Sequence, residues 1–419
     1  MTQTSPQLPD GFRELALGDD RLRDVLELDA WAFANTQSVD DLLTLPSPLP
    51  ADRSWALSPD GQSLAAMHAS YPFAASPVPG GRVAVSGLTW VGVHPQWRRR
   101  GLLRTMIASH FAHSLARNEP VSLLFAAEPG IYGRFGYGLA ARSTTLTLPR
   151  RAALRPVSTD GLDVRIETVN ADRHADLVAE LHASIDRPGW VTRPSEAARR
   201  TRVINSPLFA EGRETQRILI AERAGVPVGY AMFRRKPHWT DTGSPAYEVH
   251  VLEAVTPDAA VAHLIWSRLL DLDLTTKVVT GMLAVDDPLL SLLVDLRTAN
   301  PIWSDQLWLR LLDVPTALAA RQYQAPLDVV IDLTDADLPA NAGRWHLQAA
   351  PFAQARVQRT DREPQLRMDV RELGAVYLGQ TSLCELAGAG LVEDLTGTAL
   401  LVTSAAFGWP IAPVASWVF

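Results

Sequence analysis

An arginine-rich turn offers the clearest chemistry in the sequence. Val91 to Val93 end an extended run, Pro95 stops it, and Arg98-Arg99-Arg100-Gly101 opens a segment of helical spacing, GLLRTMIASHFAHSL. A helix N-terminus carries free backbone N–H groups and about half a positive charge, and arginines beside it add donors suited to phosphate oxygens. The turn therefore favours a diphosphate or another compact polyanion. A solvated arginine cluster on a loop is the alternative.

A second segment that could take part in a reaction is EPGIYGRFGY, which begins at Glu128, the last residue of the compact apolar stretch VSLLFAAE. Its Tyr132 has a hydroxyl that can donate a proton to a reacting atom within hydrogen-bond reach. The alternative is an aromatic side chain that packs in a turn. The glycines that follow run in the reverse order of a dinucleotide-binding fingerprint, so we reject that motif.

The other familiar motifs are missing from the sequence. It contains no H-E-x-x-H, no phosphate-binding P-loop and no G-x-S-x-G element. His110 and His113 stand three residues apart on one predicted helix, without an acidic or thiol partner nearby. We interpret them as core and surface histidines and expect no metal site. Cys384, the single cysteine, can form neither an internal disulfide nor a zinc knuckle.

Length and charge restrict the class of protein. The 419 residues correspond to about three domains, and 47% apolar with 20% charged residues is ordinary globular usage. The net charge of −7 is spread along the chain. We therefore expect neither a nucleic-acid partner nor a membrane surface. The N-terminus has no apolar signal region, and no apolar run is long enough to span a bilayer, which predicts a cytoplasmic protein.

The elements that would position these residues fall into three stretches, 1–150, 151–312 and 313–419. In the first, the spacing predicts an amphipathic helix over 14–33, extended segments at Ser54–Leu57, Leu64–Tyr71 and 82–93, and the helix from Gly101. The second stretch repeats this order weakly, which suggests an internal duplication. The third has short strands and then apolar helices. Its end, PIAPVASWVF, is apolar, which predicts that the terminus is held against the protein.

The arginine-rich turn and the segment around Tyr132 together resemble a known protein family. Arg98-x-x-Gly101-x-Leu103 resembles the acyl-CoA pyrophosphate loop of the GNAT N-acetyltransferases, and Tyr132-x-x-x-Gly136-Tyr137 resembles their second motif. RRRGLLR, GIYGRFGYG, EAVTPDA, VREL, VYLG and the terminal Phe419 resemble the enhanced intracellular survival (Eis) family over essentially the whole chain.

The resemblance implies an α/β (α+β) fold with two tandem GNAT-like domains and a C-terminal domain of sterol-carrier-protein type. Only the first GNAT-like domain would bind acetyl-CoA. The second copy has Pro257-Asp258-Ala259 where the first has arginines. An acidic residue there would repel a diphosphate, so we interpret the second domain as degenerate and structural.

The resemblance also assigns roles to residues. In the acetyl-CoA site, Val91, Gly92 and Val93 would pair with the pantetheine, Arg99, Arg100, Gly101, Leu102, Leu103 and Arg104 would hold the pyrophosphate, and Ala127 and Glu128 would lie along the cofactor. Tyr132 would be the general acid toward the CoA thiolate. The carboxylate of Phe419 would be the general base; a free α-carboxyl has a pKa of ~3.5, which burial would raise. Otherwise Phe419 merely packs.

The acceptor is predicted only as an amine of a small molecule or peptide. Trp31, Phe33, Tyr71 and Trp90 are aromatic candidates for its pocket, and each could equally belong to the core. The resemblance implies that members acting on aminoglycosides carry acidic residues near the pocket, one of them just before the terminal Phe. Here Val418 precedes Phe419 and the matching helix region has Asn35, so a polycationic acceptor is less favoured. The resemblance suggests a homohexamer built as a dimer of trimers. A CoA- or lipid-binding sensor with weak catalysis is the second hypothesis; the retained Tyr132 and Phe419 favour an enzyme.

Overall fold

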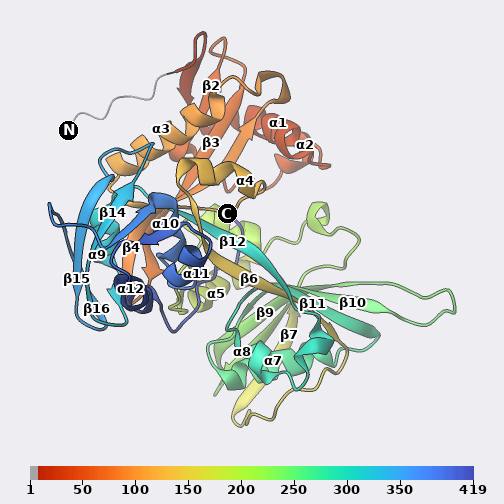
Figure 1. The fold of residues 1–419 in the computed structure, drawn as a ribbon. Coiled ribbons are helices and arrows are strands. Elements are labelled where there is room, and N and C mark those ends of the chain that lie inside the picture. The colour runs from red at the N-terminus through yellow and green to blue at the C-terminus, as the bar shows by residue number, and fades with distance from the viewer. Residues whose placement is uncertain (1–7) are drawn as a thin grey trace. The chain divides into compact units, whose positions relative to one another are not determined.

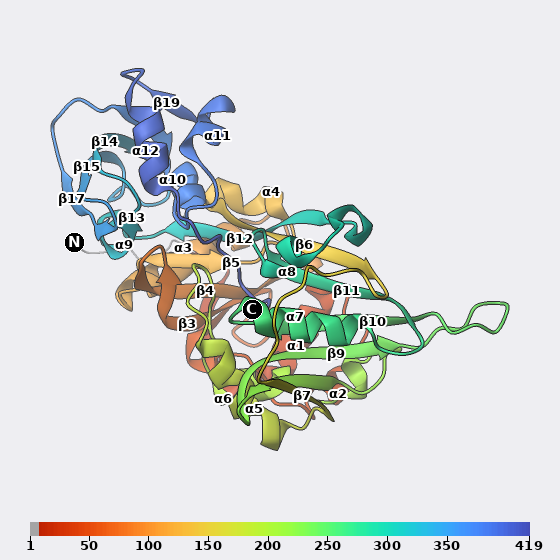
Figure 2. The same cartoon turned by 90° about the horizontal axis from the view of Figure 1, so that it is seen from below.

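A computed structural model describes residues 8–419, which form two compact units. Unit 1 contains residues 8–141, 306–413 and 418–419, and unit 2 contains 142–305 and 414–417. Figures 1 and 2 show both units in two views. No helix within residues 8–419 is long and apolar enough to cross a membrane.

The first sheet of unit 1 has the strand order β1-β2-β3-β4-β5-β12. Pairing is antiparallel throughout except between β4 and β5, which run parallel. The strands are β1 (Arg13–Ala16), β2 (Ser54–Ser58), β3 (Ala66–Val78), β4 (Gly81–Val93), β5 (Val121–Leu124) and β12 (Ile302–Leu311). The helices of this part are η1 (Asp19–Arg21), α1 (Leu22–Phe33), α2 (Val39–Leu42), η2 (Ala51–Arg53), η3 (Pro95–Trp97), α3 (Leu102–Ala116), α4 (Pro129–Tyr132) and η4 (Gly133–Phe135).

The helix expected from residue 14 begins later than predicted. Residues Arg13–Ala16 instead pair with β2, and α1 starts at Leu22. The helix buries Val25, Leu26 and Leu28 against the sheet, and it ends where Ala34 turns left-handed at φ 53°. The strand β4 ends at Val93, one residue before His94-Pro95, as the sequence predicts. Helix α3 crosses the same sheet over β2 and β3 (Figure 1).

The C-terminal part of unit 1 is a five-stranded sheet of order β17-β15-β14-β18-β19, with a small β13–β16 pair. A buried ion pair joins Arg310 to Asp335, with two contacts of 2.6 and 2.7 Å. The elements are α9 (Val314–Ala320), β13 (Gln322–Tyr323), β14 (Leu327–Thr334), β15 (Gly343–Ala349), β16 (Ala353–Gln354), β17 (Arg356–Arg359), β18 (Leu366–Asp369), α10 (Val370–Val376), α11 (Leu383–Gly388), β19 (Val392–Asp394) and α12 (Ala399–Phe407).

Gly138, at the end of the GIYGRFGYG segment, lies directly under α10. A Cβ there would overlap the carbonyl oxygen of Arg371 and lie 2.5 Å from the backbone nitrogen of Ala375. Neither backbone atom can move aside without displacing the helix, so the glycine allows α10 to approach the strand. This glycine thus has a packing reason that is independent of ligand binding.

We expect Gly138→Ala to destabilise the protein by ~1–3 kcal/mol or more, the usual cost of overpacking. Chemical denaturation followed by fluorescence measures the loss. Gly130→Ala is the matched control, because nothing lies within 4 Å of its added Cβ. Equal stability of the two variants would contradict the close approach of α10.

Unit 2 is built on a sheet of order β6-β11-β10-β9-β8-β7. Helix α7 packs along this sheet, with buried Val261, Ile265 and Leu269 facing it, and the loop between β9 and β10 extends well beyond it (Figure 2). The elements are β6 (Gly138–Pro149), β7 (Leu162–Thr168), α5 (Ala171–Ala183), α6 (Glu196–Arg202), η5 (Pro207–Phe209), β8 (Arg217–Arg223), β9 (Val226–Lys236), β10 (Tyr247–Val255), α7 (Ala259–Leu270), β11 (Thr275–Ala284), α8 (Pro288–Leu292) and η6 (Leu296–Ala299).

Candidate functional site

The parallel strands β4 and β5 separate and leave a strand edge open. Their pairing runs from Val85–Val121 to Gly87–Leu123, whereas β4 continues along β3 as far as Val93. A bulge accompanies the separation, because Trp90 has φ 53° and the β3–β4 register shifts beside it. The backbone of Val91 to Val93 is therefore available on the β5 side to an extended ligand that carries amide groups.

The turn after β4 presents the N-terminus of α3 to the same space. Gly101 is the N-cap residue, at φ 82°, and no side chain caps the helix. Arg99 also has positive φ, 63°, an uncommon conformation for a residue with a Cβ. This backbone leaves the first N–H groups of α3 open and directs exposed arginine side chains beside them, which is an arrangement suited to phosphate.

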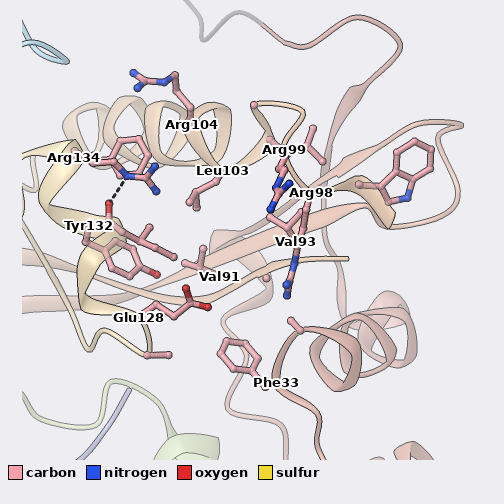
Figure 3. Close-up of a pocket in the computed structure, with 18 residues that line it drawn as sticks. Phe33, Val91, Val93, Arg98, Arg99, Leu103, Arg104, Glu128, Tyr132 and Arg134 are labelled. Carbon is pink, nitrogen blue, oxygen red and sulfur yellow. Dashed lines mark hydrogen bonds between the residues drawn. The ribbon is translucent and has the colours of Figure 1, made fainter. Parts of the chain in front are cut away.

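The two features line one pocket of about 460 Å³, a volume typical of ligand sites. Figure 3 shows Arg98 and Arg99 extending into it from the turn, Tyr132 and Glu128 from the opposite side, and Phe33 from α1. The residues lining it are Ala32, Phe33, Val91, Gly92, Val93, Trp97, Arg98, Arg99, Gly101, Leu102, Leu103, Arg104, Ala127, Glu128, Ile131, Tyr132, Arg134 and Phe135.

Tyr132 ends the short helix α4 and is held from behind by Tyr137, with ring centroids 5.9 Å apart. Tyr137 is buried, and a hydrogen-bonded chain fixes it: its hydroxyl lies 2.8 Å from Ser122 Oγ, which lies 2.8 Å from His110 Nε2. Burial, helped by the charge of Glu128, raises the pKa of Tyr132 to about 12. The Tyr132 phenol therefore keeps its proton at neutral pH and can donate it.

The terminal residue lies at the point where β4 and β5 separate. The Phe419 ring packs edge-on against Phe73 and Phe125, at centroid distances of 5.0 and 5.2 Å. A Cβ on Gly87, the last β4 residue paired with β5, would come within 3.1 Å of the Phe419 ring. Phe419 is 9% exposed, so the terminus is held as its apolar sequence predicts.

Some residues predicted for the site do not line this pocket or do not point into it, and Phe419 is not among its lining residues. Arg100 does not line the pocket, because its guanidinium stacks over Trp97 at 4.8 Å. Arg104 lines the pocket, but its charged end points away, toward Asp337 at 3.4 Å (Figure 3). Of the four aromatic candidates for the acceptor pocket, only Phe33 lines this pocket.

The other three aromatic candidates have packing or surface roles in the structure. Trp31 is 64% exposed, with its ring beside His94. Trp90 packs against a core cluster under α1, and its indole donates a hydrogen bond to the Tyr71 hydroxyl. Tyr71 is buried beside Phe73, and burial raises its pKa to about 12.

Some lining residues escaped the sequence prediction. Arg98 faces the pocket although only the next arginines were assigned to it, and Trp97, Ile131 and Arg134 also line it. The signal for Arg98 was its place in the Arg-x-x-Gly spacing. Phe73 and Phe125 do not line the pocket but contact the Phe419 ring. No local sequence signal could predict this contact, because Phe419 lies at the far end of the chain. Among residues 8–419, no three His, Cys, Asp or Glu side chains gather as a metal site requires.

The equivalent helix of unit 2 has no open N-terminus. Asp258 is the N-cap of α7, and its carboxylate accepts a hydrogen bond of 2.9 Å from the Val261 N–H. The same carboxylate pairs with Arg223 at 2.9 Å. Helix α3 has no side-chain cap, whereas α7 is capped by its own carboxylate, which leaves the N-terminus of α7 less available to an anion.

Comparison with known proteins assigns the parts of the chain. Models of the acetyltransferase (GNAT) domain match residues 15–140 and 189–311, and a sterol carrier protein domain model matches 314–416. The fold is therefore α/β, with two GNAT domains and a C-terminal domain of sterol-carrier type.

Relatives and solved structures agree with the domain matches. An uncharacterised N-acetyltransferase of Streptomyces coelicolor is 35% identical over 86% of this chain and 88% of its own. N-acetyltransferase Eis of Mycobacterium tuberculosis is 33% identical over 77% of each chain. The crystal structure of Eis1 from Mycobacterium abscessus superposes with a TM-score of 0.81 over 97% of this chain and 100% of its own, at 29% identity. The chain belongs to the Eis family of GNAT N-acetyltransferases.

Proposed function

We propose that this N-acetyltransferase binds acetyl-CoA in the pocket of unit 1 and transfers the acetyl group directly to an amine. The observation that carries the proposal is one pocket that combines the open edge of Val91 to Val93, the uncapped α3 N-terminus and the Tyr132 hydroxyl. A linear ligand with amide groups and a diphosphate fits this combination. No metal takes part in the proposed reaction.

Different residues of the pocket bind different parts of acetyl-CoA. The β4 edge hydrogen-bonds the pantetheine amides, and Ala127 and Glu128 lie on the other side of it. Arg98, Arg99 and the N–H groups that follow Gly101 bind the pyrophosphate. These contacts set the reactive thioester at the end of the pocket nearest Tyr132.

Two groups then move protons while the amine nitrogen bonds to the acetyl carbon and the carbon–sulfur bond breaks. The Phe419 carboxylate accepts the proton that the amine loses, directly or through a water molecule. Tyr132 donates its phenolic proton to the departing sulfur, which leaves as the CoA thiol. Exchange with solvent then restores both groups.

A CoA-release assay over a panel of amines tests the proposed activity. Polyamines, aminoglycosides, arylalkylamines and lysine peptides each report a different acceptor class. Release above the hydrolysis background with any amine supports transfer. CoA binding without release across the panel would support the second hypothesis, a sensor that has lost turnover. Light scattering tests the homohexamer that we propose from the family.

We expect Arg99→Ala to weaken CoA binding by ~10–100-fold, since hydrogen bonds to charged groups contribute ~1.5–3 kcal/mol. Calorimetry measures the affinity. Arg100→Ala is the matched control: it removes the same charge from the neighbouring residue, whose guanidinium stacks on Trp97. The affinity of the Arg100→Ala variant for CoA should change by less than about fivefold, the range for an exposed charge. Equal losses in both variants would contradict the assigned pyrophosphate site.

A further inference from the structure

The carboxylate of Glu128 lines the unit 1 pocket and is not engaged by the protein itself. Glu128 is the N-cap residue of α4, a position where an acidic side chain usually accepts a hydrogen bond from the helix, but its side chain makes no such bond. The residue is exposed, and within residues 8–419 its carboxylate takes part in no hydrogen bond or ion pair. Its charge is therefore available to a molecule in the pocket.

The two sides of this pocket carry opposite charge. Arg98 and Arg99 extend into it from the turn before α3, whereas Glu128 and Tyr132 enter from the opposite side (Figure 3). Glu128 is the one acidic residue among the described residues that line the pocket. Burial, and after it the charge of Glu128, raise the pKa of Tyr132, so the carboxylate lies within electrostatic range of the phenol. A diphosphate is attracted to the arginines and repelled by Glu128, which leaves Glu128 for another ligand group.

Phe33 adds an apolar surface to the same pocket. It is the last residue of α1, its ring lines the pocket, and the residue is 48% exposed although it is aromatic. The last turn of α1 contains no basic residue, so no side chain there offsets the partial negative charge of the helix C-terminus. An aromatic ring, a helix C-terminus and the free carboxylate of Glu128 all favour a cation attached to an apolar stem.

We propose that Glu128 binds the ammonium group of the acceptor while Phe33 packs on its apolar stem, which makes the acceptor a monoamine with an aryl or alkyl arm. The inference rests on the proposed function, because it assumes acetyl transfer beside Tyr132. An alkylamine has a pKa near ~10 and arrives protonated at neutral pH, as the cation that a carboxylate recognises. The other charged residues that line the pocket are arginines, which repel the further charges of a polyamine. The bound ammonium then loses its proton to the general base before the nitrogen attacks.

Glu128→Gln tests this role, because it removes the charge and keeps the shape. The probes are 2-phenylethylamine, followed as a substrate, and the uncharged 2-phenylethanol, followed as a competitive inhibitor. We expect the KM for the amine to rise about tenfold or more, the scale of one hydrogen bond between charged groups. Inhibition by the alcohol, kcat and the calorimetric Kd for CoA should each change less than about threefold. Glu27→Gln is the matched control, since it removes the same charge from an exposed α1 residue that does not line the pocket, and it should leave the KM for the amine within about twofold.

The outcomes separate this inference from the proposed function. An unchanged KM for 2-phenylethylamine in Glu128→Gln overturns the inference and leaves acetyl transfer in place. A loss of kcat at constant KM, a loss of CoA affinity, or an equal loss for the alcohol also overturns it, because Glu128 would then act on the reaction, the cofactor or the pocket shape. A native chain that acetylates other amines but not 2-phenylethylamine overturns it as well. If the native chain acetylates no amine, the proposed function itself fails, and this inference fails with it.

Discussion

Tyr132→Phe is expected to lower kcat by ~10²–10⁴-fold, the usual contribution of a positioned general acid, while acetyl-CoA binds with unchanged affinity. The substitution removes only the hydroxyl, and the ring keeps its contact with Tyr137. Steady-state kinetics with the best amine, together with calorimetry of CoA binding, separates the loss of turnover from any loss of binding.

The matched control is Tyr137→Phe, which removes the same group from a tyrosine that does not line the pocket. Its hydroxyl is bonded to Ser122, so this variant should lose ~1 kcal/mol of stability but little turnover. The pH profile adds a second check. Because burial raises the pKa of Tyr132 to about 12, ionisation of the phenol should cause no loss of rate below about pH 11. A native kcat for Tyr132→Phe would reduce Tyr132 to a packing residue.

Amidating the terminal carboxyl of Phe419 is expected to abolish acetyl transfer without changing acetyl-CoA binding. Amidation removes the charge and the basic oxygen but adds almost no volume, so the ring can keep its contacts with Phe73 and Phe125. Protein ligation gives the amidated chain, and CoA release with the best amine measures its rate.

A chain extended beyond Phe419 makes the complementary comparison. Extension converts the same carboxyl into an amide and also adds bulk at the point where β4 and β5 separate. Loss of activity in the extended chain alone would assign the effect to steric blocking. Loss in both forms, with retained CoA affinity, supports the carboxylate as base, and native activity in both would show that Phe419 only packs.

Much of the unit 1 site was predictable because its signals are local. Pro95 ends a strand through its own sterics, and Gly101 accepts the left-handed backbone that begins α3, so the strand–turn–helix follows from neighbouring residues. Asp258 alone predicted that the N-terminus of α7 would not bind a diphosphate, because its charge would repel one. The structure supplies a more direct cause, since the Asp258 carboxylate caps its own helix.

The sequence by itself determined the family, its two types of domain, the arginine turn and the separate tyrosine segment, because each of these two segments is defined by residues a few positions apart. Tertiary structure alone decided which arginines face the pocket, since the left-handed backbone at Arg99 turns successive side chains in different directions and sends Arg100 onto Trp97. It also decided which residues the last few residues of the sequence contact. Phe419 meets Gly87 and Phe125, while Trp417 meets Val191, through contacts between residues far apart in sequence. Such contacts leave no periodicity or motif, because they depend on how whole sheets pack and not on any neighbouring residue.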